Sequence, residues 1–157
     1  IDEAIEASPY KKSIRVLGFI HSEELPFWYA GSIGLVFPSL VEGFGFAVVE
    51  AQACGTLVVS SNRTSLTEVA GPATLLFDPK NIKAIESALE QLAFMPNDER
   101  KALIEESIAW AQQFDWDRVA AQVVEVYNEL LNPSDASAIE PSPDLATQHT
   151  EVNRTAP

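Results

Sequence analysis

Residues 33–60 read IGLVFPSLVEGFGFAVVEAQACGTLVVS. The two apolar runs in this stretch, at 33–37 and 57–60, have the length and composition of strands buried in a parallel sheet. Between them, the segment 46–53 is predicted to be a helix that ends at Gly55. The order strand, helix, strand predicts parallel pairing with a right-handed crossover.

The same alternation extends in both directions from this stretch. The sequence predicts a strand at 14–20 and a short helix at 22–30 before it, then a short helix at 66–70 and a strand at 74–77 after it. Three amphipathic helices are expected to follow, beginning near Asn81, Asp98 and Asp115. We therefore predict an α/β fold, a Rossmann-like parallel sheet with flanking helices and C-terminal helices.

The last part of the chain has a different composition. Residues 133–157 are rich in Pro, Ser, Thr, Ala and acidic side chains and show no periodicity, which is typical of a disordered tail. The predicted division is a domain at 1–132 and an acidic tail at 133–157. The chain opens Ile1-Asp2-Glu3 and has its one Met at position 95, so we expect a fragment or a processed product.

Composition and charge exclude several classes of protein. The 157 residues are 46% hydrophobic with a net charge of −13, which fits a globular domain and argues against binding to a nucleic-acid backbone. No apolar run is long enough to span a membrane. A single cysteine, Cys54, can form neither an internal disulfide nor a zinc site by itself, so a cytoplasmic location is expected.

The candidate site lies at 38–50, between the end of a predicted strand and the following helix. Ligands bind at this edge of open α/β sheets. Gly43 and Gly45 allow a tight turn and a close approach of the backbone, and a helix start attracts an anion such as phosphate. Glu42 and Glu50 enclose seven residues, and two carboxylates facing one cleft are suited to hold the hydroxyls of a sugar and a ribose. The spacing therefore predicts a sugar-nucleotide site.

This stretch resembles the Glu, seven residues, Glu motif of the large retaining glycosyltransferase family called glycosyl transferases group 1, which includes bacterial sucrose- and glycogen-synthase-like enzymes. The resemblance covers about residues 10 to 131. Its other blocks are Leu17-Gly18-Phe19-Ile20, Glu23-Glu24-Leu25, Tyr29-Ala30, residues 55–61, Glu68-Val69-Ala70-Gly71, Leu75-Leu76-Phe77-Asp78-Pro79, Phe114-Asp115-Trp116 and the closing helix to Leu131. One difference is Phe46-Ala47, where many members have Leu-Pro or a similar pair.

The resemblance implies the C-terminal, donor-binding domain of a two-domain enzyme that transfers sugar with retention, without a metal or other cofactor. Glu42 would be the catalytic and sugar-binding acid, and Glu50 would bind ribose hydroxyls. The remaining substrate-binding positions it implies are Gly43, Phe44, Gly45 and Phe46 beside the diphosphate and Phe19 and Ile20 near the base.

The partners it implies are a UDP-, GDP- or ADP-sugar donor, a sugar or lipid acceptor, and an N-terminal domain outside these residues. The family's Arg and Lys, which neutralise the leaving diphosphate, would also lie outside this chain, and Arg63 is the one nearby cation that the sequence suggests. We therefore expect the chain alone to bind donor weakly and to transfer no sugar.

Two other functions are compatible with the same residues. One is a glycoside hydrolase that uses Glu42 and Glu50 as its carboxylate pair. The other is a binding or scaffold module that keeps the fold without catalysis. Outside the motif, Glu68 is interpreted as a helix-start charge and Tyr29 as a core aromatic residue.

Overall fold

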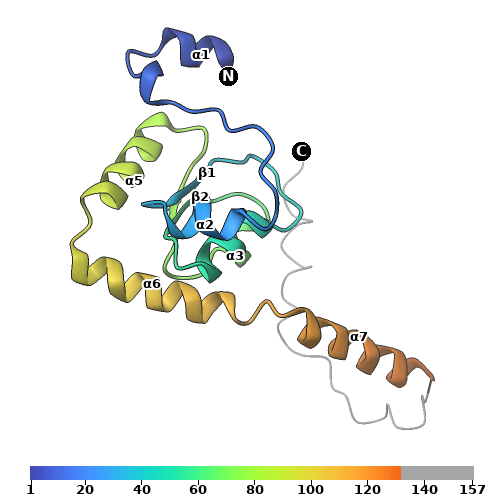
Figure 1. Cartoon of the computed structure of the whole chain (residues 1–157). Helices are drawn as coiled ribbons and strands as arrows, with labels where there is room; N and C mark the ends of the chain where they lie inside the picture. Colours follow the sequence, from blue (N-terminus) through green and yellow to red (C-terminus); the bar gives the residue numbers. More distant parts are fainter. Residues whose placement is uncertain (132–157) are drawn as a thin grey trace, which may run out of the picture. The chain divides into compact units, whose positions relative to one another are not determined.

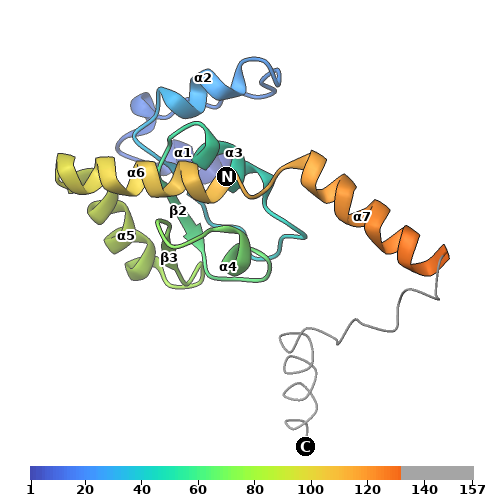
Figure 2. The ribbon, with the colours of Figure 1, turned by 90° about the horizontal axis from the view of Figure 1, so that it is seen from below.

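A computed structural model of the protein describes residues 1–131. Residues 1–113 form one compact unit that contains a three-stranded parallel sheet in the order β1-β2-β3; Figure 1 labels β1 and β2, and Figure 2 labels β2 and β3. The strands are β1 (Leu35–Phe37), β2 (Val58–Ser61) and β3 (Leu75–Phe77). Leu35 lies opposite Val58, and Val59 lies opposite Leu75. All four residues of β2 are buried, as expected for a central strand that is covered on both faces.

Three of the shorter helices are α2 (Leu25–Ala30), α3 (Phe46–Ala53) and α4 (Leu66–Val69). Val48 and Ala51 of α3, Leu66 of α4 and the following Ala70 form a first buried cluster with Val58 of β2. Tyr29 of α2 packs against this cluster. The helix α1 (Asp2–Ala7) and a 3₁₀ turn (Lys11–Ser13) precede this part of the chain.

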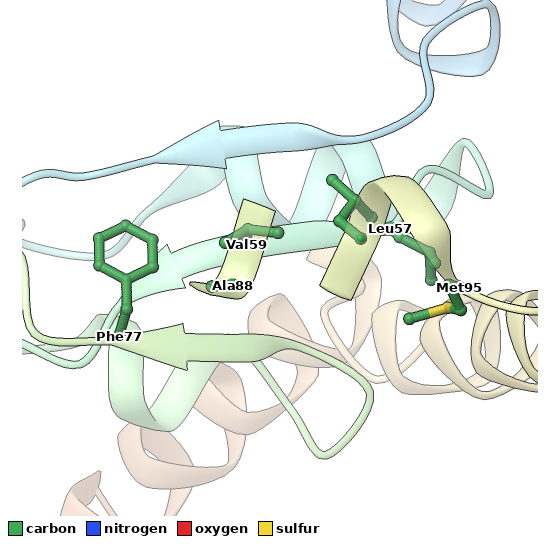
Figure 3. Packing of buried hydrophobic residues seen from close by; sticks show 6 residues of the cluster. Leu57, Val59, Phe77, Ala88 and Met95 are labelled. Carbon is green, nitrogen blue, oxygen red and sulfur yellow. The ribbon is translucent and has the colours of Figure 1, made fainter. Parts of the chain in front are cut away.

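The longer helices α5 (Ile82–Phe94) and α6 (Asn97–Ala111) contribute to a second cluster. Because side chains alternate along a strand, Val58 packs into the first cluster while Leu57 and Val59 pack into the second. Figure 3 shows Leu57 and Val59 together with Phe77, Ala88 and Met95, and Leu92 completes the cluster. The Asn81 side chain caps α5 by accepting hydrogen bonds from two backbone N–H groups. The helix α6 also contacts α3 (Figure 2).

The last described helix belongs to a second compact unit that begins at Phe114. This helix, α7, spans Trp116–Leu131, and the Asp115 carboxylate accepts from the Asp117 N–H at 3.1 Å, as expected of a capping residue. None of the helices within residues 1–131 combines the length and the apolar character that a membrane span requires. The predicted tail at 133–157 lies outside the described residues, so the division into 1–132 and 133–157 stays a prediction.

The predicted strands and helices from residue 33 onward are confirmed with small shifts of their ends, and α3 has the predicted bounds. The strand predicted at 14–20 is wrong. This segment is not part of the sheet, and several of its apolar side chains face solvent, with Val16 75% exposed. Apolar composition favours a strand only where a neighbouring strand supplies ladder hydrogen bonds, and the described sheet consists of β1, β2 and β3 alone.

The first short helix begins three residues later than predicted. The helix α2 begins at Leu25, with Glu24 in the cap position, and no side chain caps its backbone. The structure has Pro26 in the first turn, where its missing N–H costs no helical hydrogen bond. Gly31 follows the last helical residue.

Candidate functional site

The loop 38–45 leads from the carboxyl end of β1 to the start of α3, and Gly45 makes the turn into the helix. Gly45 has a φ of 109°, a conformation that side chains strongly disfavour. A Cβ at this position would lie 2.6 Å from Cδ2 of Leu66, which is fully buried. Glycine is therefore required at 45 for both conformation and space, and no side chain caps the N-terminus of α3 that follows it.

Gly43 differs from Gly45 although the two are only two residues apart. Its φ lies outside the left-handed region, and a Cβ built on it would have no atom within 4 Å. Neither conformation nor packing requires glycine here, so the backbone at 43 borders open space. Phe44 and Phe46 lie on either side of Gly45 in sequence, and their ring centroids are 4.7 Å apart.

The backbone of Glu42 is held at both ends by the segment that leads into α4. Its N–H donates to Oγ1 of Thr64 at 3.1 Å, and its carbonyl oxygen accepts from Oγ of Ser65 at 3.0 Å. Thr64 and Ser65 follow the carboxyl end of β2, so the loops after two neighbouring parallel strands are joined at Glu42. The Glu42 residue itself is partly buried.

The other predicted acid, Glu50, lies on α3 and is held by a neighbouring helix. The Tyr29 hydroxyl of α2 donates to Oε2 of Glu50 at 3.3 Å. Burial raises the pKa of Tyr29 to about 12, with a further contribution from the Glu50 carboxylate. Tyr29 therefore keeps its proton at neutral pH and remains a donor. Glu50 is exposed, so the other lone pairs of its carboxylate face solvent.

The free cysteine next to this pair is not an activated nucleophile. Burial raises the pKa of the Cys54 thiol, and the Glu50 carboxylate adds to this effect. The thiol is therefore protonated at neutral pH, and Cys54 lies just after the last residue of α3.

The two residues predicted to lie near the base are found in the segment before α2. Phe19 is 84% exposed, and its ring makes an edge contact with His21 at a centroid distance of 5.1 Å. Ile20 is partly buried. This segment has no regular secondary structure, so it is not the strand that the sequence predicted.

Two cations lie at the carboxyl edge of the sheet, close to Asp78. Nη2 of Arg63 lies 2.9 Å from Oδ1 of Asp78, and the Lys80 backbone N–H donates to the same oxygen at 3.1 Å. The hydrogen bond from Arg63, together with that from Lys80 and the charges of both residues, holds the pKa of Asp78 below its ordinary value. Arg63, the cation suggested by the sequence, is thus already paired with a carboxylate.

Three features of this site were not predicted from the sequence. Tyr29 was interpreted as a core aromatic residue; it packs against the first cluster, but its hydroxyl also donates to Glu50. The contacts of Thr64 and Ser65 with Glu42, and that of Lys80 with Asp78, are the other two. A signal for the first existed, because a tyrosine that packs at the edge of a core needs a partner for its hydroxyl.

Two different structural elements thus hold Glu42 and Glu50. Glu42 is fixed by the start of α4 and Glu50 by α2, while the uncapped start of α3 and the open backbone at Gly43 lie between them in sequence. Backbone N–H groups at a helix start attract an anion, and carboxylates accept hydrogen bonds from hydroxyl groups. The loop 38–45 and the start of α3 thus present groups of both kinds within nine residues of the sequence, Glu42 to Glu50.

Comparison with known proteins gives a consistent result. The family model described as "Glycosyl transferases group 1" matches residues 1–110. O-antigen chain mannosyltransferase B from Escherichia coli is 37% identical over 128 residues, which cover 82% of this chain and 33% of that protein. D-inositol 3-phosphate glycosyltransferase from Corynebacterium urealyticum is 33% identical over 132 residues, which cover 83% of this chain and 31% of that protein.

A solved structure shows the same arrangement of elements. Sucrose-phosphate synthase from Thermosynechococcus elongatus superposes with a TM-score of 0.77 and 26% sequence identity, covering 84% of this chain and 34% of that one. The predicted α/β fold, a Rossmann-like parallel sheet with flanking helices, is therefore confirmed. The chain spans about a third of the length of these relatives.

Proposed function

The chain belongs to the glycosyl transferases group 1 family, and from this premise we propose that residues 1–132 are the donor-binding part of a retaining glycosyltransferase. The donor would be a UDP-, GDP- or ADP-sugar. The relatives named above carry glycosyltransferase names, which favours sugar transfer over the glycoside hydrolase that the same two acids would allow.

The observation that carries this proposal is the uncapped start of α3 at the carboxyl edge of a parallel sheet. Glu42 lies just before this helix start, and Glu50 lies within the helix. The open backbone at Gly43 adds to it, because a glycine that the fold does not need leaves room for a ligand to approach the main chain.

Each residue has a role in this proposal. Glu42 contacts the donor sugar near the reacting carbon, and Glu50 accepts hydrogen bonds from the ribose hydroxyls. The main chain from Gly43 to Phe46 binds the diphosphate, and Phe19 and Ile20 lie near the base. The Tyr29 hydroxyl donates to the Glu50 carboxylate and holds it in place.

Transfer by this chain alone is not part of the proposal. A departing nucleoside diphosphate needs positive charge, and Arg63 is already paired with Asp78. We propose that further cations and the binding site for a sugar or lipid acceptor are supplied by an N-terminal domain outside these residues. The 157 residues then bind donor weakly and transfer no sugar.

A binding titration with the nucleotides tests the proposal. We expect UDP, GDP or ADP to bind the wild-type chain weakly, as followed by ligand-observed NMR. Glu50→Ala should weaken the binding of that nucleotide by about tenfold, because a hydrogen bond to a charged group contributes roughly 1.5–3 kcal/mol. Glu90→Ala is the matched control, an exposed glutamate on α5, and should bind as the wild type does.

Circular dichroism of both variants checks that the fold is intact. Equal affinity of Glu50→Ala and the wild type would contradict the role of Glu50. Failure of the folded wild type to bind any of the three nucleotides would favour the scaffold module instead.

A further inference from the structure

Thr64 is the one residue other than glycine that has a positive φ within residues 1–131. Its φ is 49°, in the left-handed region. A β-branched side chain is a strong outlier there, because its Cβ crowds the backbone. Such a conformation persists only where the surrounding contacts hold it, and these residues cluster at functional sites.

The contacts that hold Thr64 lead to Glu42. Its Oγ1 accepts from the Glu42 N–H at 3.1 Å, and its own carbonyl oxygen accepts from Oγ1 of Thr67 at 2.9 Å. The next residue, Ser65, donates to the Glu42 carbonyl oxygen. Both backbone polar groups of Glu42 are thus bound by side chains that lie 22 and 23 residues further along the chain.

A purely structural role explains this arrangement poorly. Thr64 is exposed, and a hydrogen bond open to water contributes little to the stability of the fold. Glycine would adopt the same φ without strain. A threonine at this position differs from a glycine because its hydroxyl binds the N–H group of Glu42. This hydrogen bond fixes the backbone at Glu42 and therefore the direction in which the Glu42 side chain leaves the loop.

We propose that Thr64 is a positioning residue that orients Glu42 toward the sugar of the donor and so sets the preference for a sugar nucleotide over the bare nucleoside diphosphate. This inference rests on the proposed function, in which Glu42 contacts the donor sugar and other groups bind the nucleotide. Loss of the Thr64 hydroxyl therefore affects the sugar and spares the nucleotide.

Three substitutions separate the hydroxyl from the backbone strain. Thr64→Val keeps the branched shape without the hydrogen bond, Thr64→Gly removes both hydroxyl and strain, and Thr64→Ser keeps the hydroxyl. The measurement is the ratio of two Kd values, one for a bare nucleoside diphosphate and one for its sugar conjugate. The pairs are UDP with UDP-glucose, GDP with GDP-mannose, and ADP with ADP-glucose. The pair used is the one that binds the wild type, and thermal unfolding is followed in parallel.

We expect the preference for the conjugate to fall by about fivefold or more in Thr64→Val and Thr64→Gly, with the Kd of the bare nucleotide within about twofold of the wild type. Thr64→Ser should retain the wild-type preference, because it keeps the hydroxyl that accepts from the Glu42 N–H. Thr64→Gly keeps the test valid if Thr64→Val does not fold.

Two results would overturn the inference. One is a wild type that binds the nucleotide without any preference for the conjugate. The other is an unchanged preference in Thr64→Gly, whether or not its unfolding temperature falls. A folded wild type that binds no nucleotide at all is a different outcome, because it contradicts the proposed function itself.

Discussion

Gly45→Ala should lower the free energy of unfolding by about 2–4 kcal/mol, because a left-handed φ is costly for alanine and extra volume in a packed core adds further strain. The φ of 109° and the 2.6 Å approach of a Cβ to the Leu66 side chain both act here. Leu66 is fully buried in the first cluster, so it has little room to move away. Urea denaturation followed by circular dichroism measures the change.

Gly43→Ala is the matched control for this effect. Its Cβ meets no atom within 4 Å and its φ is not left-handed, so we expect a change in the free energy of unfolding within about 1 kcal/mol. Equal losses of stability in the two variants would contradict the different environments of the two glycines.

The second large effect concerns binding, and we expect it from Gly43→Ala, the substitution that leaves stability nearly unchanged. Gly43→Ala should weaken the binding of the nucleoside diphosphate by about thirtyfold, since a methyl group forced into an occupied site costs roughly 2 kcal/mol. The open space next to Gly43 is where the proposed diphosphate approaches the main chain. The Kd is measured by ligand-observed NMR on a variant whose unfolding free energy has been determined first.

The control for this measurement is Glu90→Ala, which changes an exposed residue on α5, outside the candidate site. It should leave the Kd of the nucleotide unchanged. If folded Gly43→Ala bound the nucleotide as tightly as the wild type, the space beside Gly43 would not be the diphosphate site.

The elements that depend on local sequence signals were predictable. The helix α3 has its predicted bounds because Gly45 and Gly55 mark its two ends, and both have the positive φ that interrupts a helix. The helix α7 begins after Asp115 because that side chain caps its first turn. In these cases the signal and the structure it determines lie within a few residues of each other.

The features that the sequence analysis missed depend on residues that are far apart in the chain. The apolar run at 14–20 has strand composition but no strand beside it among β1, β2 and β3. Tyr29 reaches Glu50 across 21 residues, and Thr64 reaches Glu42 across 22. The spacing of residues along the sequence does not indicate such pairs, because only the packing of the helices against the sheet brings them together.

The two glycines of the motif show the same limit within a single loop. Gly43 and Gly45 are the same residue type two positions apart, so both were predicted to have the same role. The backbone φ and the neighbouring Leu66 side chain, which comes from another helix, distinguish them. The fold explains Gly45, and the proposed ligand explains Gly43.

Amide hydrogen exchange of the wild-type chain, followed residue by residue by NMR with and without the nucleoside diphosphate, tests the central claim most directly. The account predicts that the nucleotide slows exchange at the backbone N–H groups of residues 43–47, at the start of α3. Nucleotide-dependent protection confined to another surface, with exchange at 43–47 unchanged, would contradict it.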